Sequence, residues 1–239
     1  MRYAIYFTPP RDDPLTLAAQ AWLGRNAFTG GAVRRPSFAE LDGEFLAAHT
    51  SAPRRYGFHA TLVAPFHLRA GLDENDLLDH LDRFSASRTA FELAVEIGRI
   101  GPFFAVVPAA GSARLQDFAA GAVEHFAPLR APLTHADIER RRPDRLTPRQ
   151  LAYLERWGYP WVMEEFRFHM TLTGALSDDA AARIEPLLRR HFADVLAQPL
   201  NLDGVAVFAE AAPGDDFVVK ARRSFPGLPD TGSNERKTA

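Results

Sequence analysis

Phe58-His59-Ala60-Thr61-Leu62 recurs with a single substitution as Phe168-His169-Met170-Thr171-Leu172. Successive side chains of a β-strand point to opposite faces, so His59 and Thr61 share one face of the first segment. His169 and Thr171 share one face of the second segment, and Arg167 has the same parity. The apolar residues between them occupy the other face. The repeat therefore predicts two strands, each with a core face and a polar face.

The same order of elements follows each copy of the repeat. The apolar spacing predicts a strand, a helix and a hairpin in each half, at 56–67, 73–84, 91–97 and 103–107, and again at 166–173, 177–195, 201–208 and 216–225. We expect an α+β fold of two pseudo-symmetric βαβ-type lobes, with antiparallel sheets around a central cleft. Residues 1–225 would form this single bilobal domain. Residues 226–239 lack apolar periodicity and are expected to be a disordered tail.

Other elements are predicted from the signals at their ends. The sequence favours a strand over 2–8 and helices over 14–23, 38–48, 113–129 and 148–157. The helix at 14–23 has proline at its start and Gly24 just past its end. Thr147 and Gln150 would form a capping box before the helix at 148–157. The segment 25–55 is otherwise interpreted as a long connection.

The composition excludes several classes of function. The formal net charge of -2 gives no overall attraction to nucleic acid or to an anionic membrane, so an anion site must come from local clustering. The absence of cysteine excludes disulfides, thiolate metal sites and a cysteine nucleophile. No apolar run approaches the length of a membrane span, and the chain turns to Thr8-Pro9-Pro10 too soon for a secretory signal. We expect a cytoplasmic protein that does not contact the membrane.

The polar faces of the two segments suit the chemistry of phosphoesters. One imidazole of a histidine pair can take a proton while the other gives one. Threonine hydroxyls and the Arg167 guanidinium suit the non-bridging oxygens of a phosphoryl group. We therefore hypothesise metal-independent phosphodiester chemistry without a cofactor, with His59 and His169 as the catalytic pair. A metal site is the principal alternative, although neither segment has a His-Glu-x-x-His spacing or a neighbouring Asp.

The paired segments resemble the H-x-T motifs of the two-histidine (2H) phosphoesterase superfamily. Longer segments are similar to a bacterial branch of it that is associated with phosphonate metabolism, at 2–9, 146–160 and 166–174. The resemblance implies two βαβ-containing lobes around a cleft, catalytic roles for His59 and His169, and phosphate-holding hydroxyls on Thr61 and Thr171. Strand parity adds Arg167 to the phosphate-binding residues, and Tyr56 or Tyr6 is a further candidate at the cleft.

The resemblance also implies a reaction and a substrate. In this branch, breakdown of carbon-phosphorus bonds yields a small phosphorylated ribose that carries a cyclic phosphate. The expected enzyme is a phosphoric diester hydrolase, a cyclic phosphodiesterase, that opens the ring. The arginine-rich segment 140–149 would bind the second phosphate of this substrate, or it is a solvated run of charge.

Several alternatives stay open at this point. An RNA 2',3'-cyclic phosphodiesterase, a 2'-5' RNA ligase-like enzyme, and a non-catalytic phosphate- or RNA-binding module share the same residues. RNA is the less favoured partner, because the sequence lacks an interleaved basic and aromatic face. Tyr159, Trp161 and Phe166 are interpreted as core residues. The sequence does not decide the exact substrate, the oligomeric state, or which histidine is the general acid.

Overall fold

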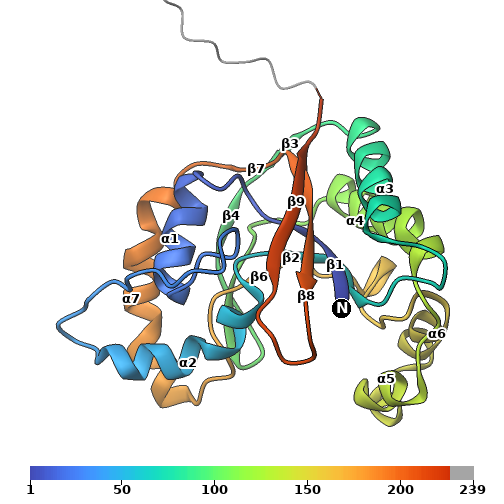
Figure 1. The fold of residues 1–239 in the computed structure, drawn as a ribbon. Coiled ribbons are helices and arrows are strands. Elements are labelled where there is room, and N and C mark those ends of the chain that lie inside the picture. The colour runs from blue at the N-terminus through green and yellow to red at the C-terminus, as the bar shows by residue number, and fades with distance from the viewer. Residues whose placement is uncertain (227–239) are drawn as a thin grey trace, which may run out of the picture.

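One central sheet organises the chain in the computed structural model, which describes residues 1–226 (Figure 1). The sheet has seven strands in the order β4-β5-β6-β2-β1-β8-β9, and all their pairings are antiparallel. These strands are β1 Arg2–Phe7, β2 Ala60–Phe66, β4 Val95–Ile100, β5 Phe103–Pro108, β6 Met170–Thr171, β8 Gly204–Glu210 and β9 Val218–Ser224. Two short strands, β3 Phe91–Leu93 and β7 Leu200–Leu202, pair with each other.

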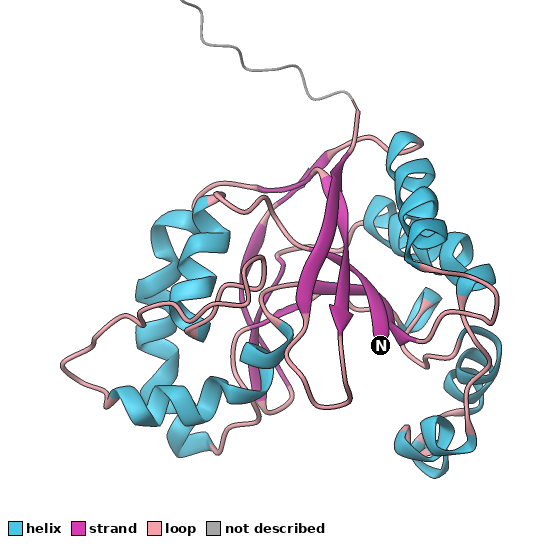
Figure 2. Cartoon of the chain, in the orientation of Figure 1, coloured by secondary structure: helices cyan, strands magenta, loops and turns pink. Residues whose placement is uncertain are grey.

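The helices form two groups at opposite ends of this sheet (Figures 1 and 2). One group packs near β4 and consists of α1 Pro14–Leu23, α2 Gly43–Tyr56 and α7 Asp178–Leu196. In the other group α3 Glu74–Ala86 packs against β8 and β9, and α4 Ala113–Phe126 packs against β2. The short helix α5 His135–Arg140 and α6 Pro148–Trp157 lie at this second end. The α+β class and the antiparallel sheets predicted from the sequence are confirmed.

Alternation along β1 shows which face of the sheet the helices cover. Tyr3, Ile5 and Phe7 belong to the main hydrophobic core, together with buried residues of α1, α3, α4 and α7. Ala4 and Tyr6 point to the other face, where they form a small cluster with Ala206, Phe208 and Phe217. One face therefore carries nearly all of the core, and the opposite face is left for the polar side chains of the repeat.

The repeated segments place their apolar residues as the parity argument predicts. The buried side chains are those of Phe58, Ala60, Leu62, Phe168, Met170 and Leu172, and all of them belong to the main core. Burying one such large apolar side chain contributes roughly 1.5–3 kcal/mol. This burial fixes the register of both segments, because a slip by one residue would move the apolar set to the polar face.

Several end signals in the sequence act as predicted. Asp73 caps α3, and Thr147 and Gln150 form the capping box at the start of α6. Asp13, which was not predicted as a cap, caps α1. Gly24 and Gly158 end α1 and α6 with φ of 72° and 69°, in the left-handed region that favours glycine. The hairpins β4–β5 and β8–β9 are also confirmed.

The assignment of elements to the two halves differs from the prediction. The hairpin β4–β5 from the first half pairs with β6, and the hairpin β8–β9 from the second half pairs with β1. The reason is that β1 lies outside the repeat and occupies one edge of β2, while β6 occupies the other. Each hairpin therefore pairs with a strand that lies outside its own predicted half of the chain. The pseudo-symmetry of two lobes stays a prediction.

Element boundaries around the repeat were also predicted wrongly. The expected strand at 56–67 begins only at Ala60, because α2 starts after its N-cap Asp42 and continues to Tyr56. The expected strand at 166–173 is reduced to the two residues of β6. The helix α5 was not predicted. Nearly all of the predicted tail, residues 227–239, lies outside the described residues. Within the described part, no helix combines the length and the apolar character that a membrane span needs.

Candidate functional site

The two repeated segments lie side by side in the middle of the sheet. Ala60 of β2 pairs with Met170 of β6 in an antiparallel register. This register sets His59 opposite Thr171 and Thr61 opposite His169, with all four on the face away from the main core. Diagonal neighbours across such a pair are about 7–8 Å apart, which is the expected spacing of the two histidine backbones. A separation of 110 residues in sequence thus becomes one cross-strand cluster.

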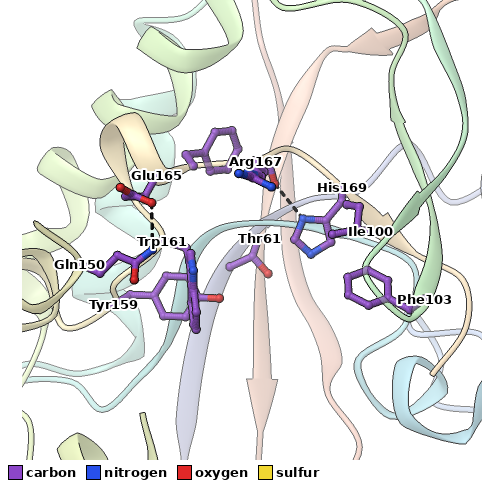
Figure 3. A pocket seen from close by; sticks show the side chains of 10 residues that line it. Thr61, Ile100, Phe103, Gln150, Tyr159, Trp161, Glu165, Arg167 and His169 are labelled. Carbon is purple, nitrogen blue, oxygen red and sulfur yellow. Dashed lines mark hydrogen bonds between the residues drawn. The ribbon is translucent and has the colours of Figure 1, made fainter. Parts of the chain in front are cut away.

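Two cavities open at this cluster, and each contains one histidine and the threonine opposite it. The larger, about 440 Å³, is lined by Thr61, His169 and Arg167 (Figure 3). The smaller, about 230 Å³, is lined by His59, Thr171 and Tyr56, among others. Phe103 of β5 lines both cavities. The predicted site residues His59, His169, Thr61, Thr171, Arg167 and Tyr56 are therefore brought together around a single aromatic side chain.

Both histidines are held by a backbone carbonyl two residues earlier. The Nδ1 atom of His59 lies 2.9 Å from the Gly57 carbonyl oxygen. The Nδ1 atom of His169 lies 2.7 Å from the Arg167 carbonyl oxygen, as Figure 3 shows. A carbonyl oxygen can only accept, so Nδ1 carries the proton in each ring. The lone pair of the neutral imidazole is then on Nε2. In His59 this atom accepts a hydrogen bond from the Thr61 hydroxyl at 3.2 Å.

The environment of His59 favours its neutral form. The pKa of His59 is lowered to about 4, chiefly because burial penalises the charged ring and further because His169 can carry a like charge nearby. The hydrogen bond to the Gly57 carbonyl opposes this shift. At neutral pH the Nε2 atom of His59 is therefore available to accept a proton.

Tyr56 is placed by the end of a helix and by a network of charges. Its ring stacks on Phe217 with centroids 5.1 Å apart, and its hydroxyl accepts a hydrogen bond from Arg55 at 3.2 Å. Arg55 in turn pairs with Glu210, which is buried and also pairs with Arg2. The network fixes the wall of the smaller cavity, although sequence reasoning expected Tyr56 on a strand.

The wall of the larger cavity combines a free cation with aromatic side chains. Arg167 is exposed, and its guanidinium has no ion-pair partner among residues 1–226. Tyr159 and Trp161 line the same cavity, and Trp161 is 43% exposed. The interpretation of Trp161 as core packing is wrong, because this side chain is exposed at the cavity. Tyr159 is half-buried, and its ring lies 5.4 Å from that of Trp161. Phe166 is buried in the core as expected.

The arginine-rich segment 140–149 lies outside both cavities. Arg140 pairs with Asp137 at 2.8 Å, one turn earlier in α5. The Arg141 guanidinium lies 4.8 Å from the centre of the Tyr159 ring. None of the arginines of this segment is among the residues that line the two histidine cavities. The geometry therefore gives no support to the idea that they bind a second phosphate there.

Two residues that complete the site were not singled out by their sequence pattern. Phe103 follows a Gly-Pro turn and was interpreted only as the start of a strand. Tyr6 is only an alternative to Tyr56 in the sequence pattern, yet its ring stacks on His59. The parity of β1 could have placed Tyr6 on the same face as Ala4, but nothing in the sequence says that β1 neighbours β2. No group of three or more His, Asp or Glu side chains in the described residues is arranged to hold a metal ion, and metal independence stays a prediction.

Comparison with known proteins gives matches to a family and to curated relatives. A family model described as "Protein of unknown function (DUF1045)" matches residues 61–218. A protein of Janthinobacterium sp. (strain Marseille) named ribose 1,5-bisphosphate phosphokinase PhnN is 38% identical over 237 residues, which are 97% of this chain and 52% of the relative. A protein of Laribacter hongkongensis (strain HLHK9) with the same name is 33% identical over 218 residues, 91% of this chain and 50% of the relative.

These names correct one expectation from the sequence. A phosphokinase is a transferase, so the names of both relatives overturn the predicted phosphoric diester hydrolase. The chain spans about half the length of the curated relatives it matches. The part of this chain that the longer match covers includes both H-x-T segments, since that match covers 97% of the chain.

Proposed function

The chain belongs to the family described as "Protein of unknown function (DUF1045)", and from this premise we propose that its paired H-x-T segments bind a small phosphorylated ribose and catalyse phosphoryl transfer on it, as part of phosphonate catabolism. The supporting observation is the cross-strand register of Ala60 and Met170, which brings two imidazoles and two hydroxyls to one face. Membership of the 2H superfamily is part of this proposal.

The two histidines would divide the proton transfers. The neutral Nε2 of His59 would take the proton of the attacking oxygen as the new P–O bond forms. His169, in its protonated form, would give its Nε2 proton to the leaving oxygen as the old P–O bond breaks. The pair thus exchanges its protonation states in one turnover, and loss of a proton from His59 to solvent and uptake of one by His169 would restore them. The low pKa of His59 supports its assignment as the base.

The other predicted residues would hold the phosphoryl group. The hydroxyls of Thr61 and Thr171 lie opposite the histidines, and the Arg167 guanidinium is free to donate to a non-bridging oxygen. Donors that are fixed before the reaction stabilise the charge that develops in the transition state, and removing one such donor costs roughly 3 kcal/mol in known cases. Tyr56 would contact the ligand from the smaller cavity.

The name of the relatives supports the choice of ribose as the sugar. They are named for ribose 1,5-bisphosphate, which carries two phosphate groups on a small sugar. The sequence has no glycine followed by lysine, as a G-x-x-x-x-G-K-[ST] phosphate-binding loop requires. In this chain the phosphate would therefore be bound by the donors of the cleft. One phosphate, as a monoester or as a cyclic ester, would lie between the two imidazoles.

Phosphorus NMR on defined sugars tests the proposal. The purified chain is incubated with ribose 1,5-bisphosphate, and with ribose 5-phosphate that carries a 1,2-cyclic phosphate, each with and without ATP as a phosphoryl donor. We expect a time-dependent change of the phosphorus spectrum that His59→Ala and His169→Ala each slow by about 100-fold or more. His135→Ala is the control, because the His135 side chain is 85% exposed on α5. Turnover that persists at the wild-type rate in both cleft variants would disprove the assignment.

A further inference from the structure

A third cavity lies at the C-terminal end of α6 and contains neither of the paired histidines. It has a volume of about 410 Å³ and lies between the turn at Ala127–Leu129, the helix α5 and the C-terminal end of α6. None of its lining residues lines either histidine cavity. Three of them are arginines, Arg69, Arg130 and Arg156, and a single carboxylate, Glu155, stands against them. The cavity therefore has an excess of positive charge.

Arg130 is the least exposed of these arginines, and its charge is not compensated. Its side chain has no ion pair or hydrogen bond in the described residues, and its Nε atom is buried without a partner. Arg25 is a buried arginine that shows the usual solution: it pairs with Asp216 at 3.0 Å and donates to backbone carbonyls, including that of Phe217 at 2.7 Å. A buried charge is normally paired in this way. Arg130 therefore differs from the structural arginine of the same chain.

The surroundings of Arg130 do not neutralise its charge. Burial, and then the like charge of Arg141, lower the pKa of Arg130 to about 10, so it stays charged at neutral pH. The end of α6 offers only the partial negative charge of a helix C-terminus. An anion in the cavity would supply the full countercharge that the protein does not.

Gly158 shows that this end of α6 is shaped around the guanidinium. A Cβ at Gly158 would lie 1.7 Å from Nη2 of Arg130, closer than any real contact. Gly158 also has a φ of 69°, so glycine is favoured there by both backbone and space. The Arg130 side chain is thus held against the helix end. Arg69 and Arg156 are exposed, and neither has an ion-pair partner in the described part of the chain.

We propose that this cavity is a second anion site, which binds the phosphate group of a small phosphorylated molecule through Arg130, with Arg69 and Arg156 at its rim. Guanidinium groups donate paired hydrogen bonds that match the geometry of phosphate oxygens. The site is independent of the chemistry at the histidines, because it shares no lining residue with them.

Calorimetric titration of a variant that lacks both histidines measures binding without the phosphoryl-transfer chemistry. The chain with His59→Ala and His169→Ala is titrated with inorganic pyrophosphate and, separately, with ribose 5-phosphate. We expect each probe to bind. Pyrophosphate should bind more tightly if the site recognises the phosphate group alone, and ribose 5-phosphate should bind more tightly if the site also contacts the sugar. Failure of both probes to bind this double variant at millimolar concentration would overturn the proposal, whatever the fate of the phosphoryl-transfer activity.

Substitutions at the cavity then locate the binding. Adding Arg130→Gln to the double variant should weaken binding by about tenfold or more, because a hydrogen bond to a charged group is lost. The rim pair Arg69→Gln and Arg156→Gln is exposed and tests the same site if the Arg130 variant fails to fold. The control is Arg189→Gln, since Arg189 is an exposed arginine of α7 that pairs with Glu185. Equal binding in the rim variant and in the control would also overturn the proposal.

Discussion

The phenol ring of Tyr6 lies over the imidazole of His59, with ring centroids 3.8 Å apart and planes 19° from parallel. Tyr6 is buried in β1, and its ring closes one face of the imidazole to water. Burial is the main reason for the low pKa of His59. A strand outside both copies of the repeat thus makes the environment of the first histidine different from that of the second, whose ring lies 5.8 Å from Phe103.

Replacing Tyr6 should therefore raise the pKa of His59. In Tyr6→Leu the flat ring is lost and water reaches the imidazole, so the pKa should move from about 4 toward the ordinary value of 6.5. Tyr6→Phe keeps the stacked ring and should leave the value nearly unchanged. An NMR titration of the histidine ring protons in each variant measures this. A value that stays near 4 in Tyr6→Leu would show that Tyr6 is not the group that desolvates His59.

The same shift predicts how stability depends on pH. Between about pH 6.5 and pH 4 the unfolded chain binds a proton at His59 that the folded protein does not bind, so the free energy of unfolding must fall as the pH is lowered through this range. The contribution is at most about 3 kcal/mol, and partial exposure of the ring reduces it. The pKa values of His80 and His125 are also lowered, by burial first, so they add to the same slope.

A comparison of the wild type with a His59 variant measures how much His59 contributes to the pH dependence of stability. Urea unfolding of the wild type and of His59→Gln is measured at about pH 7 and at about pH 4.5. The variant should lose less stability than the wild type on acidification, because His80 and His125 titrate in both proteins. Parallel losses in the two proteins would mean that His59 has an ordinary pKa in the folded state.

Thr61 should contribute to phosphate binding through its hydroxyl. In the free protein this hydroxyl donates a hydrogen bond to Nε2 of His59. A bound phosphate oxygen would accept that hydrogen bond instead. Thr61→Val keeps the shape of the side chain and removes the hydroxyl, so the Kd for a ribose phosphate should rise by about tenfold. Thr61→Ser keeps the donor and should bind within about threefold of the wild type. Calorimetry on the two variants measures the difference, and equal affinity would place the phosphate away from Thr61.

Much of the local structure could be predicted from the sequence because the signals are local. Asp13, Asp73 and Thr147 cap their helices through side chains that reach only two or three residues along the chain. The alternation of Phe58, Ala60 and Leu62 decides their burial in the same local way. The order of the strands depends on which edges remain free once β1 has paired with β2, and no local pattern carries this information. For that reason the hairpins were found but their neighbours were not.

The candidate site was also predicted in part: the residues that share a face were predicted, and their surroundings were not. The parity of the repeat anticipated that His59 and Thr61 share a face, and the structure adds that the antiparallel register crosses the pairs, so that His59 faces Thr171. The environment of each histidine depends on residues brought in from other strands, such as Tyr6 and Phe103. Burial of His59 among such residues lowers its pKa, and the sequence does not show this burial, which is why it left the acid and the base unassigned.

Gly57 should be required at the junction between α2 and β2. It has a φ of 75° and a ψ of 178°, a conformation that side chains rarely adopt, and its carbonyl oxygen holds Nδ1 of His59. A Cβ at this position would lie 2.5 Å from Cβ of Ala27, which belongs to the buried cluster beside Tyr6. Gly57→Ala therefore combines backbone strain with a steric overlap in a packed region.

A second glycine separates these two effects. Gly71 has a φ of 87°, and a Cβ there would meet nothing within 4 Å. Gly71→Ala should thus lower the free energy of unfolding by roughly 1–3 kcal/mol through the backbone alone. Gly57→Ala should lower it by about 1–3 kcal/mol more, because Ala27 must shift, and the shift should disturb the hydrogen bond of His59. Urea unfolding of both variants measures the difference. Equal losses would mean that the contact with Ala27 relaxes freely, and that Gly57 is needed for its backbone conformation only.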